Sequence, residues 1–220
     1  LRRAEAGNKA GVESNIEKLR ARHVETCHEL LPAGVREPVL AEVHRLIGEF
    51  ERIANGICML GEAPPRSTDE AVAIGERLSV LLLAAYLQHT GTRAVAVNAV
   101  SIMVTDAVFG NATPLMEPTR EKARAKLLPL LEEGALPVVT GFIGATADGR
   151  PTTLGRGGSD FSAAILASVL DAAELWIWTD VDGIMTADPR LVPDCAVLEE
   201  VTYREAAELA YNGAKVLHPR

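Results

Sequence analysis

The sequence predicts an α/β domain in which helices cover both faces of a mainly parallel sheet. Short β-rich runs alternate with helical patterns along the second half of the chain, as expected when crossover helices join parallel strands. The 220 residues are 48% hydrophobic, so the chain can bury a sizeable core. It contains neither a repeat of fixed period nor a low-complexity tract.

Three long amphipathic helices are expected in the first part of the chain. Apolar residues recur at intervals of three and four over residues 12–31 and 37–60. A third helix is expected over residues 68–89, because Ser67 and Glu70 have the spacing of a capping box before a periodic apolar run.

The remaining elements are shorter and alternate in type. The expected strands cover residues 94–98, 101–105, 137–143 and 175–179, and the expected helices cover residues 119–133, 160–171 and 203–212. Asp148-Gly149 predicts a hairpin turn between two strands.

Charge and cysteine content exclude several classes of function. With 30 acidic and 22 basic residues the net charge is -8, which argues against nucleic-acid binding through bulk charge. The three cysteines lie far apart without the spacing of a disulfide framework or zinc site, so we expect a reducing cytoplasm. No apolar run reaches the roughly 20 residues of a membrane span, and the first residues do not resemble a secretory signal.

A glycine-rich segment, TTLGRGGSD at residues 152–160, precedes one of the expected helices. It would place backbone N–H groups, a guanidinium and a hydroxyl at a helix N-terminus, which suits an anion. Arg156 could hold a carboxylate through two hydrogen bonds, whereas Asp160 beside a phosphate would need an ammonium group or a metal ion opposite it. The alternative is a glycine-rich turn with an acidic N-cap.

Glu76 interrupts an otherwise apolar stripe of the helix expected over residues 68–89. The members of this stripe are Val72, Glu76, Val80, Leu83 and Leu87. A carboxylate at such a position needs a partner. Glu76 could bind a substrate ammonium group in a cleft; alternatively, it lies in solvent at the edge of the stripe or pairs with a structural arginine.

An Asp-rich segment, WTDVDGIMTADPR at residues 178–190, follows the last expected strand. Loops at the carboxyl ends of parallel strands bind ligands in α/β proteins. The aspartates could serve a metal ion or ribose hydroxyls and Arg190 a phosphate, or the Asp and Pro residues could merely shape a turn. Neither a strand-linked GxGxxG nor a GxxxxGK[ST] motif occurs, which argues against the common dinucleotide-binding and P-loop sites.

Two other groups have simpler interpretations. His23, Cys27 and His28 are close enough on a helix to suggest metal ligands, but their surroundings are an ordinary amphipathic pattern without a further ligand cluster. Lys215 follows Asn212-Gly213-Ala214, where a helix is expected to end, so it could simply complement the helix dipole.

Five segments together resemble the aspartate kinases of the amino-acid kinase family. These are GERLS (75–79), TGFIG (140–144), TLGRGGSD (153–160), TDVDGIMTADPR (179–190) and GAKVLHP (213–219). They occur in the order of that family over nearly the whole chain, and GRGGSD and GAKVLHP are typical of its aspartate-specific branch. The resemblance implies a three-layer αβα sandwich with a substrate lobe over residues 1–133 and an ATP-binding lobe over residues 134–220, both incomplete.

The resemblance also implies a role for individual residues. Aspartate would be bound by Glu76, Arg156, Gly157, Gly158 and Ser159, with Arg156 and Asp160 at the catalytic centre. ATP would be bound by Thr179, Asp180, Met185, Arg190, Lys215 and Val216, where Met185 stands in a position that is often aromatic in the family. The implied cofactors are ATP and Mg²⁺, without a metal site built by the protein alone.

The implied reaction is the conversion of ATP and L-aspartate to ADP and 4-phospho-L-aspartate, the first step towards lysine, threonine and methionine. The family's opening strand, with a lysine and paired glycines, and its regulatory ACT domains do not occur in the sequence, so we expect this segment alone to be nearly inactive. The full-length protein is expected to be a homo-oligomer. The alternatives are another amino-acid kinase, of the glutamate or acetylglutamate type, and a noncatalytic ligand-binding module.

Overall fold

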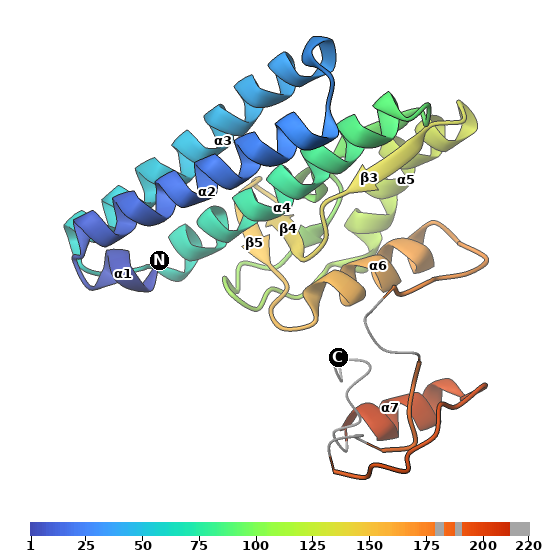
Figure 1. Ribbon diagram of the computed structural model, residues 1–220. Helices are drawn as coiled ribbons and strands as arrows, with labels where there is room; N and C mark the ends of the chain where they lie inside the picture. The colour runs from blue at the N-terminus through green and yellow to red at the C-terminus, as the bar shows by residue number, and fades with distance from the viewer. Residues whose placement is uncertain (179–182, 188–190, 212–220) are drawn as a thin grey trace.

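The computed structural model describes residues 1–178, 183–187 and 191–211. A short helix, α1 (Arg2–Glu5), precedes two long helices, α2 (Lys9–Leu30) and α3 (Ala33–Leu60), which pack side by side (Figure 1). Helix α3 ends at Leu60, and its C-cap Gly61 has a φ of 71°, in the left-handed region that glycine adopts at little cost. The predicted helices at residues 12–31 and 37–60 are confirmed.

Helix α4 (Pro65–His89) packs against α3 and joins the helical part of the molecule to the strands. It begins at Pro65, with Pro64 as the N-cap, so the capping box expected at Ser67 and Glu70 is wrong. Proline suits the first turn because its missing N–H would have no helical partner there. Ser67 and Glu70 lie inside the helix instead.

Two small groups of strands follow. Strands β1 (Ala94–Val97) and β3 (Leu136–Val139) pair in parallel, and β2 (Val104–Thr105) pairs in parallel with β4 (Ile143–Thr146). Strand β5 (Pro151–Thr153) runs antiparallel to β4, and the turn predicted at Asp148-Gly149 joins them. Two of the three described pairings are therefore parallel.

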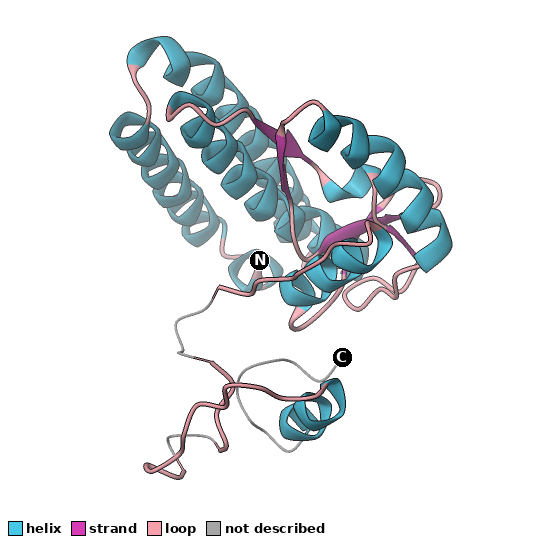
Figure 2. Cartoon of the chain, turned by 90° about the vertical axis from the view of Figure 1, so that its right-hand side faces the viewer, coloured by secondary structure: helices cyan, strands magenta, loops and turns pink. Residues whose placement is uncertain are grey.

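The strands lie between helices on two sides (Figures 1 and 2). Helix α4 packs on β1, β3 and β5, while α5 (Met116–Glu132) packs on β2 and β3, and α6 (Gly158–Val169) on β4. One core cluster fills the space among α1 to α4, and a second lies where the strands meet α5 and α6. The predicted α/β sandwich is confirmed, whereas its division at residues 133 and 134 stays a prediction.

Three predicted strands differ from the structure. Residues 137–143 do not form one strand, because β3 ends at Val139 and β4 begins at Ile143. The strand expected at residues 101–105 is shortened by a 3₁₀ turn, η1 (Ala99–Ser101). Residues 175–178 form no strand, and the Trp178 side chain is 86% exposed; a strand needs a hydrogen-bonded neighbour, which a local pattern does not supply.

The chain after α6 contains one further described helix, α7 (Tyr203–Tyr211). Figure 1 shows α7 and the loop before it apart from the other described helices. Among the described helices, none has the length and apolar character needed to cross a membrane.

Candidate functional site

The glycine-rich segment connects strand β5 to helix α6. Gly155 and Gly157 have φ values of 76° and 68°, and Gly157 is the N-cap of α6. In the first turn, the backbone N–H groups of Ser159 and Asp160 have no carbonyl partner in the described part of the chain. Helix α6 therefore presents open donors at its positive end, the arrangement that binds anions.

Two charged side chains flank these donors. Arg156 is exposed and Asp160 is half-buried, and neither side chain has a hydrogen-bond or ion-pair partner among the described residues. A charge that is removed from water usually has a partner, whereas an exposed charge such as that of Arg156 is solvated. Both groups are thus available to a ligand.

The TGFIG segment packs beneath the glycine-rich loop. The Phe142 N–H donates to Ser162 Oγ at 3.1 Å, and the Phe142 carbonyl accepts from the Leu154 N–H at 2.9 Å. Ser162 Oγ in turn donates to the Ser159 carbonyl at 2.8 Å. Phe142 has a left-handed φ of 67°, a conformation that costs a non-glycine residue on the order of 1–3 kcal/mol. The two segments form one unit that holds Phe142 in this conformation.

Gly158 lies where this unit is most tightly packed. A Cβ atom there would be 2.7 Å from Phe142 Cδ2 and 3.2 Å from Leu154 Cβ. We expect Gly158→Ala to lower the free energy of unfolding by about 1–3 kcal/mol, because a ring and a strand-end residue must both move. Gly48→Ala is the matched control: Gly48 is helical with open space around it, so alanine should stabilise α3 by about 0.5–1 kcal/mol. Urea unfolding of both variants tests this, and equal stabilities would contradict the packing.

Glu76 lies on the more exposed side of helix α4. Its carboxylate is half-buried, has no partner among the described residues, and has its pKa raised by burial. The apolar stripe expected around Glu76 is not a core face: Val72 is 40% and Leu83 50% exposed, although Val80 is buried. Helix α4 instead packs through other residues, among them Ala73, Ile74, Leu78, Ala84 and Ala85. Pairing of Glu76 with a structural arginine is not found in the described chain.

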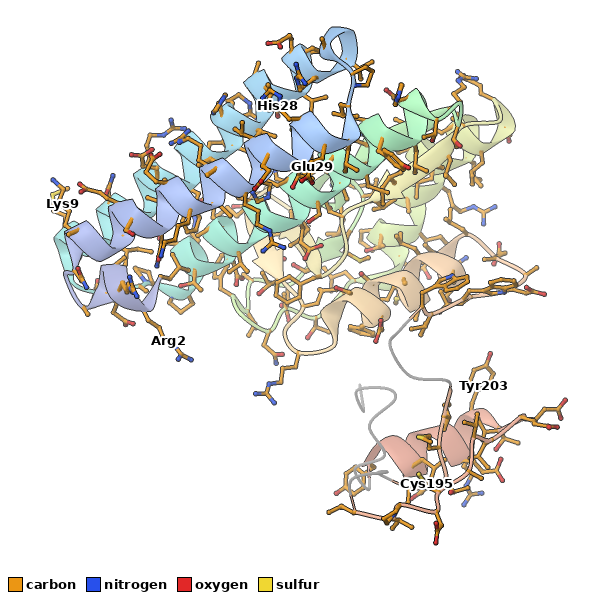
Figure 3. All side chains as sticks on the ribbon, in the orientation of Figure 1. Arg2, Lys9, His28, Glu29, Cys195 and Tyr203 are labelled. Carbon is orange, nitrogen blue, oxygen red and sulfur yellow. The ribbon has the colours of Figure 1, made fainter. Side chains whose placement is uncertain are left out.

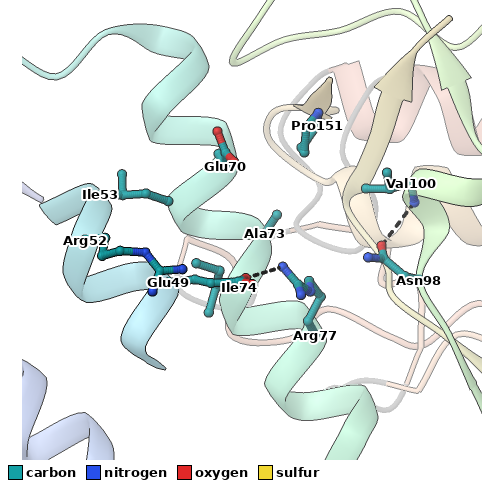
Figure 4. A pocket seen from close by; sticks show the side chains of 10 residues that line it. All are labelled: Glu49, Arg52, Ile53, Glu70, Ala73, Ile74, Arg77, Asn98, Val100 and Pro151. Atoms are coloured by element: carbon teal, nitrogen blue, oxygen red, sulfur yellow. Dashed lines mark hydrogen bonds and ion pairs between the residues drawn. The ribbon is translucent and has the colours of Figure 1, made fainter. Parts of the chain in front are cut away.

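The arginine next to Glu76 has a separate role. Arg77 donates to Glu49 Oε2 at 2.9 Å and so ties α4 to α3. Arg77 and Glu49 line a pocket of about 420 Å³ between α3, α4 and the turn after β1 (Figure 4). The other residues of this lining are Arg52, Ile53, Glu70, Ala73, Ile74, Asn98, Val100 and Pro151. None of the predicted site residues lines this pocket, so the predicted site and the pocket are different places.

A buried carboxylate that sequence reasoning missed joins α4 to the glycine-rich segment. Asp69 is 1% exposed, and its Oδ2 accepts from the Gly110 N–H at 2.8 Å and the Thr153 N–H at 3.0 Å. Its Oδ1 accepts from Thr153 Oγ1 at 2.6 Å. Glu76 follows seven residues later, two turns or roughly 10 Å along the same side of the helix. The structure thus ties the helix that carries Glu76 to the strand that leads to Arg156, although these two side chains do not touch each other.

Of the predicted nucleotide site, only Met185 is described. Thr179, Asp180, Arg190, Lys215 and Val216 lie outside the described residues. Met185 forms an isolated β-bridge with Val197, and its sulfur lies 4.0 Å from Cys195 Sγ. Cys195 lies with α7, apart from α6 (Figure 3), so the structure does not bring Met185 to the glycine-rich segment.

The metal site considered for α2 is not found. His23 Nδ1 lies 2.8 Å from the Leu19 carbonyl oxygen of its own helix, and Cys27 is buried, which raises the pKa of its thiol. Within the described ranges, no group of three or more His, Cys, Asp or Glu residues could hold a metal ion. The described polar contact of His23 is therefore made within α2.

Comparison with known proteins shows to which family the chain belongs. The model of the amino acid kinase family matches residues 5–220. The chain belongs to the amino acid kinase family. The glycine-rich loop, the TGFIG segment and the helix with Glu76 are thus features of an amino acid kinase fold, and the resemblance found in the sequence is confirmed.

Relatives of this amino acid kinase include several aspartokinases. Lysine-sensitive aspartokinase 3 of Escherichia coli K12 is 46% identical over 176 residues, which are 78% of the chain and 39% of the relative. Aspartokinase 3, chloroplastic, of Arabidopsis thaliana is 42% identical over 200 residues, 90% of the chain and 34% of the relative. The chain spans less than half the length of these two relatives.

Solved structures agree in fold. The crystal structure of E. coli aspartokinase III in complex with aspartate and ADP, in the R-state, matches with a TM-score of 0.87 and 38% identity over 94% of the chain and 45% of that protein. The same enzyme with lysine and aspartate, in the T-state, matches with a TM-score of 0.76 and 36% identity over 91% of the chain and 49% of that protein.

Proposed function

We propose that this amino acid kinase phosphorylates the side-chain carboxylate of L-aspartate with ATP, giving 4-phospho-L-aspartate and ADP. The proposal rests on two side chains of opposite charge, neither of which has a described partner. They lie on two elements that are joined by hydrogen bonds. Arg156 follows β5, Glu76 lies on α4, and Asp69 joins α4 to β5. An α-amino acid carries one carboxylate and one ammonium group, for which a guanidinium and a carboxylate are complementary partners. The aspartokinase names of the relatives support the choice of aspartate.

In this proposal each residue of the GRGGSD segment has a distinct part. Arg156 binds the α-carboxylate through two hydrogen bonds, and Glu76 binds the α-ammonium group. Gly157 and Gly158 allow close approach of the ligand to the backbone, and Ser159 adds a hydroxyl and an N–H at the start of α6. Asp160 organises the catalytic centre, where its charge requires a cation opposite it.

The chemistry requires positioning more than proton transfer. The attacking side-chain carboxylate of aspartate is ionised at neutral pH, so no general base is needed. The protein must hold two anions in line and neutralise their repulsion. Among the described residues, the open N–H groups of Ser159 and Asp160 can bind the reacting anionic oxygens, while Arg156 holds the substrate by its α-carboxylate.

We further propose that Mg²⁺ accompanies ATP, held mainly by phosphate oxygens and water. This fits the described residues, which offer the unpaired carboxylate of Asp160 but no protein cage of three or more ligands. When bound, the ion would supply positive charge to the transferring phosphoryl group. Nucleotide contacts of Thr179, Asp180, Met185, Arg190, Lys215 and Val216 belong to the same proposal.

The wider setting of the proposal is amino-acid biosynthesis leading to lysine, threonine and methionine. A cytoplasmic location is supported by the three cysteines, Cys27, Cys58 and Cys195, which are all free. Assembly into a homo-oligomer stays a prediction.

A test of the function is the ATP-dependent formation of an acyl phosphate, trapped with hydroxylamine, by the protein expressed from its complete reading frame. L-aspartate should give hydroxamate, whereas L-glutamate and N-acetyl-L-glutamate at the same concentration should give little, and UMP, which forms no acyl phosphate, should give little ADP. Glutamate or acetylglutamate as the better acceptor would assign another amino-acid kinase activity. Calorimetric binding of aspartate without any hydroxamate would indicate a noncatalytic ligand-binding module and contradict the proposal.

A further inference from the structure

Asp69 is the only charged residue among the buried side chains of the described chain, and it accepts hydrogen bonds from two segments far apart in sequence. Each of its three partners, the N–H groups of Gly110 and Thr153 and the Thr153 hydroxyl, is a donor. An ionised carboxylate offers only acceptor sites, so each of the three contacts joins a donor to an acceptor. Such a bond set, closed off from water, fixes the relative position of its members.

Every polar atom of Thr153 forms a hydrogen bond. Its N–H and hydroxyl donate to Asp69, and its carbonyl accepts from the Ala112 N–H at 2.8 Å. The preceding hydroxyl, Thr152 Oγ1, lies 2.7 Å from Thr105 Oγ1, and the following N–H, that of Leu154, donates to Phe142. Strand β5 is only three residues long, so these lateral bonds add to its pairing with β4 in setting its position.

We propose that Asp69 is a positioning residue that sets the spacing between the two charged groups of the aspartate site. Asp69 and Glu76 lie on the same side of α4, two turns apart, while Thr153 lies three residues before Arg156. The Asp69–Thr153 bonds therefore connect the ammonium-binding and carboxylate-binding groups through the protein. The inference rests on the proposed function, because it assigns to Glu76 and Arg156 the two ends of one substrate.

Removal of the Asp69–Thr153 hydrogen bonds should change the spacing between Glu76 and Arg156. In Asp69→Ala, L-aspartate should bind at least tenfold more weakly, since a displaced Glu76 or Arg156 would lose charge-assisted hydrogen bonds to the ligand. ADP should bind within about twofold of the parent protein, because Asp69 bonds to Gly110 and Thr153, neither of which is proposed to bind the nucleotide. A general loss of folding would instead weaken both ligands together.

Two further substitutions refine the test. Thr153→Val removes only the hydroxyl donor and should weaken aspartate binding by a smaller factor, about three- to tenfold; it serves if Asp69→Ala does not fold. Asp69→Asn should stay within about threefold of the parent protein, since its amide oxygen can accept from both N–H groups while its NH₂ donates to the Thr153 hydroxyl. This rescue distinguishes hydrogen-bonded positioning from a need for negative charge.

Asp106→Ala is the matched control. Asp106 accepts from the N–H groups of Thr113 and Val108 in the same loop that contains Gly110, but its carboxylate forms no hydrogen bond or ion pair with β5 in the described chain. It should leave aspartate affinity within about twofold. An effect as large as that of Asp69→Ala would assign the loss to the loop in general and overturn the role of Asp69.

The experiment uses the protein from its complete reading frame, with calorimetric titration of L-aspartate and ADP and hydrogen exchange of residues 151–159. Faster exchange in Asp69→Ala together with selective loss of aspartate affinity supports the inference. Exchange and aspartate affinity equal to those of the parent protein overturn the inference while leaving the proposed function intact. A parent protein that binds no aspartate overturns the proposed function, and with it the substrate-spacing role, even if exchange becomes faster.

Discussion

Arg156→Ala is expected to weaken L-aspartate binding by about 2–4 kcal/mol, or roughly 30- to 1,000-fold. The loss is large because a bidentate, charge-assisted contact to a carboxylate disappears. The melting temperature should not change, since Arg156 is exposed and pairs with no described residue. Calorimetric titrations with L-aspartate and with ADP measure the two affinities separately.

Arg150→Ala is the matched control for this change. Arg150 lies six residues earlier, in the turn before β5, where its Nε atom is 2.8 Å from Asp148 Oδ2. Removal of this surface ion pair should cost no more than about 1 kcal/mol of stability and leave aspartate affinity unchanged. Unchanged aspartate affinity in Arg156→Ala would remove Arg156 from the site.

Glu76→Gln is expected to have opposite effects on binding and on stability. Loss of the charge that faces the ammonium group should weaken aspartate binding by about tenfold or more, since a charged hydrogen bond is worth about 1.5–3 kcal/mol. The ligand-free protein should melt at a higher temperature, because burial raises the pKa of Glu76 and so makes its ionised form a cost at neutral pH. A residue with a purely structural role would lose stability and keep its affinity for the ligand.

The sign of the pH dependence follows from the same pKa. A carboxyl group whose folded-state pKa is raised stabilises the fold below its ordinary value, and this contribution disappears as the pH rises through the raised pKa. Ammonium binding needs the ionised form, so aspartate affinity should fall as the pH is lowered through that pKa. The affinity of Glu76→Gln should fall less over the same range, and Glu70→Gln, an exposed position on α4, should behave as the parent protein does.

The periodic pattern predicted the helices well because their packing is repeated every turn. The ends of α3 and α4 at Leu60 and His89 are where the pattern stops. Strands were less predictable, because a strand depends on a partner elsewhere in the chain. Residues 175–178 have the composition of a strand, yet the described structure gives them no partner.

The candidate site was only partly predictable for a related reason. The position of Glu76 in an apolar stripe pointed to a special role, although two members of the stripe, Val72 and Leu83, are exposed. Asp69 lies between Ser67 and Glu70, whose capping-box spacing predicts no special role for it. Its partner Thr153 lies 84 residues away, and no local rule connects the two. A useful signal would have been a second carboxylate on the side of Glu76, two turns earlier in the helix.

The most direct test of this account is a crystal structure of the protein, from its complete reading frame, with L-aspartate and a non-hydrolysable ATP analogue. The account predicts the α-carboxylate of aspartate against the guanidinium of Arg156, the α-ammonium group against Glu76, and the side-chain carboxylate directed towards the terminal phosphate. Aspartate bound away from Arg156 and Glu76, or bound with its side-chain carboxylate on Arg156, would contradict the account.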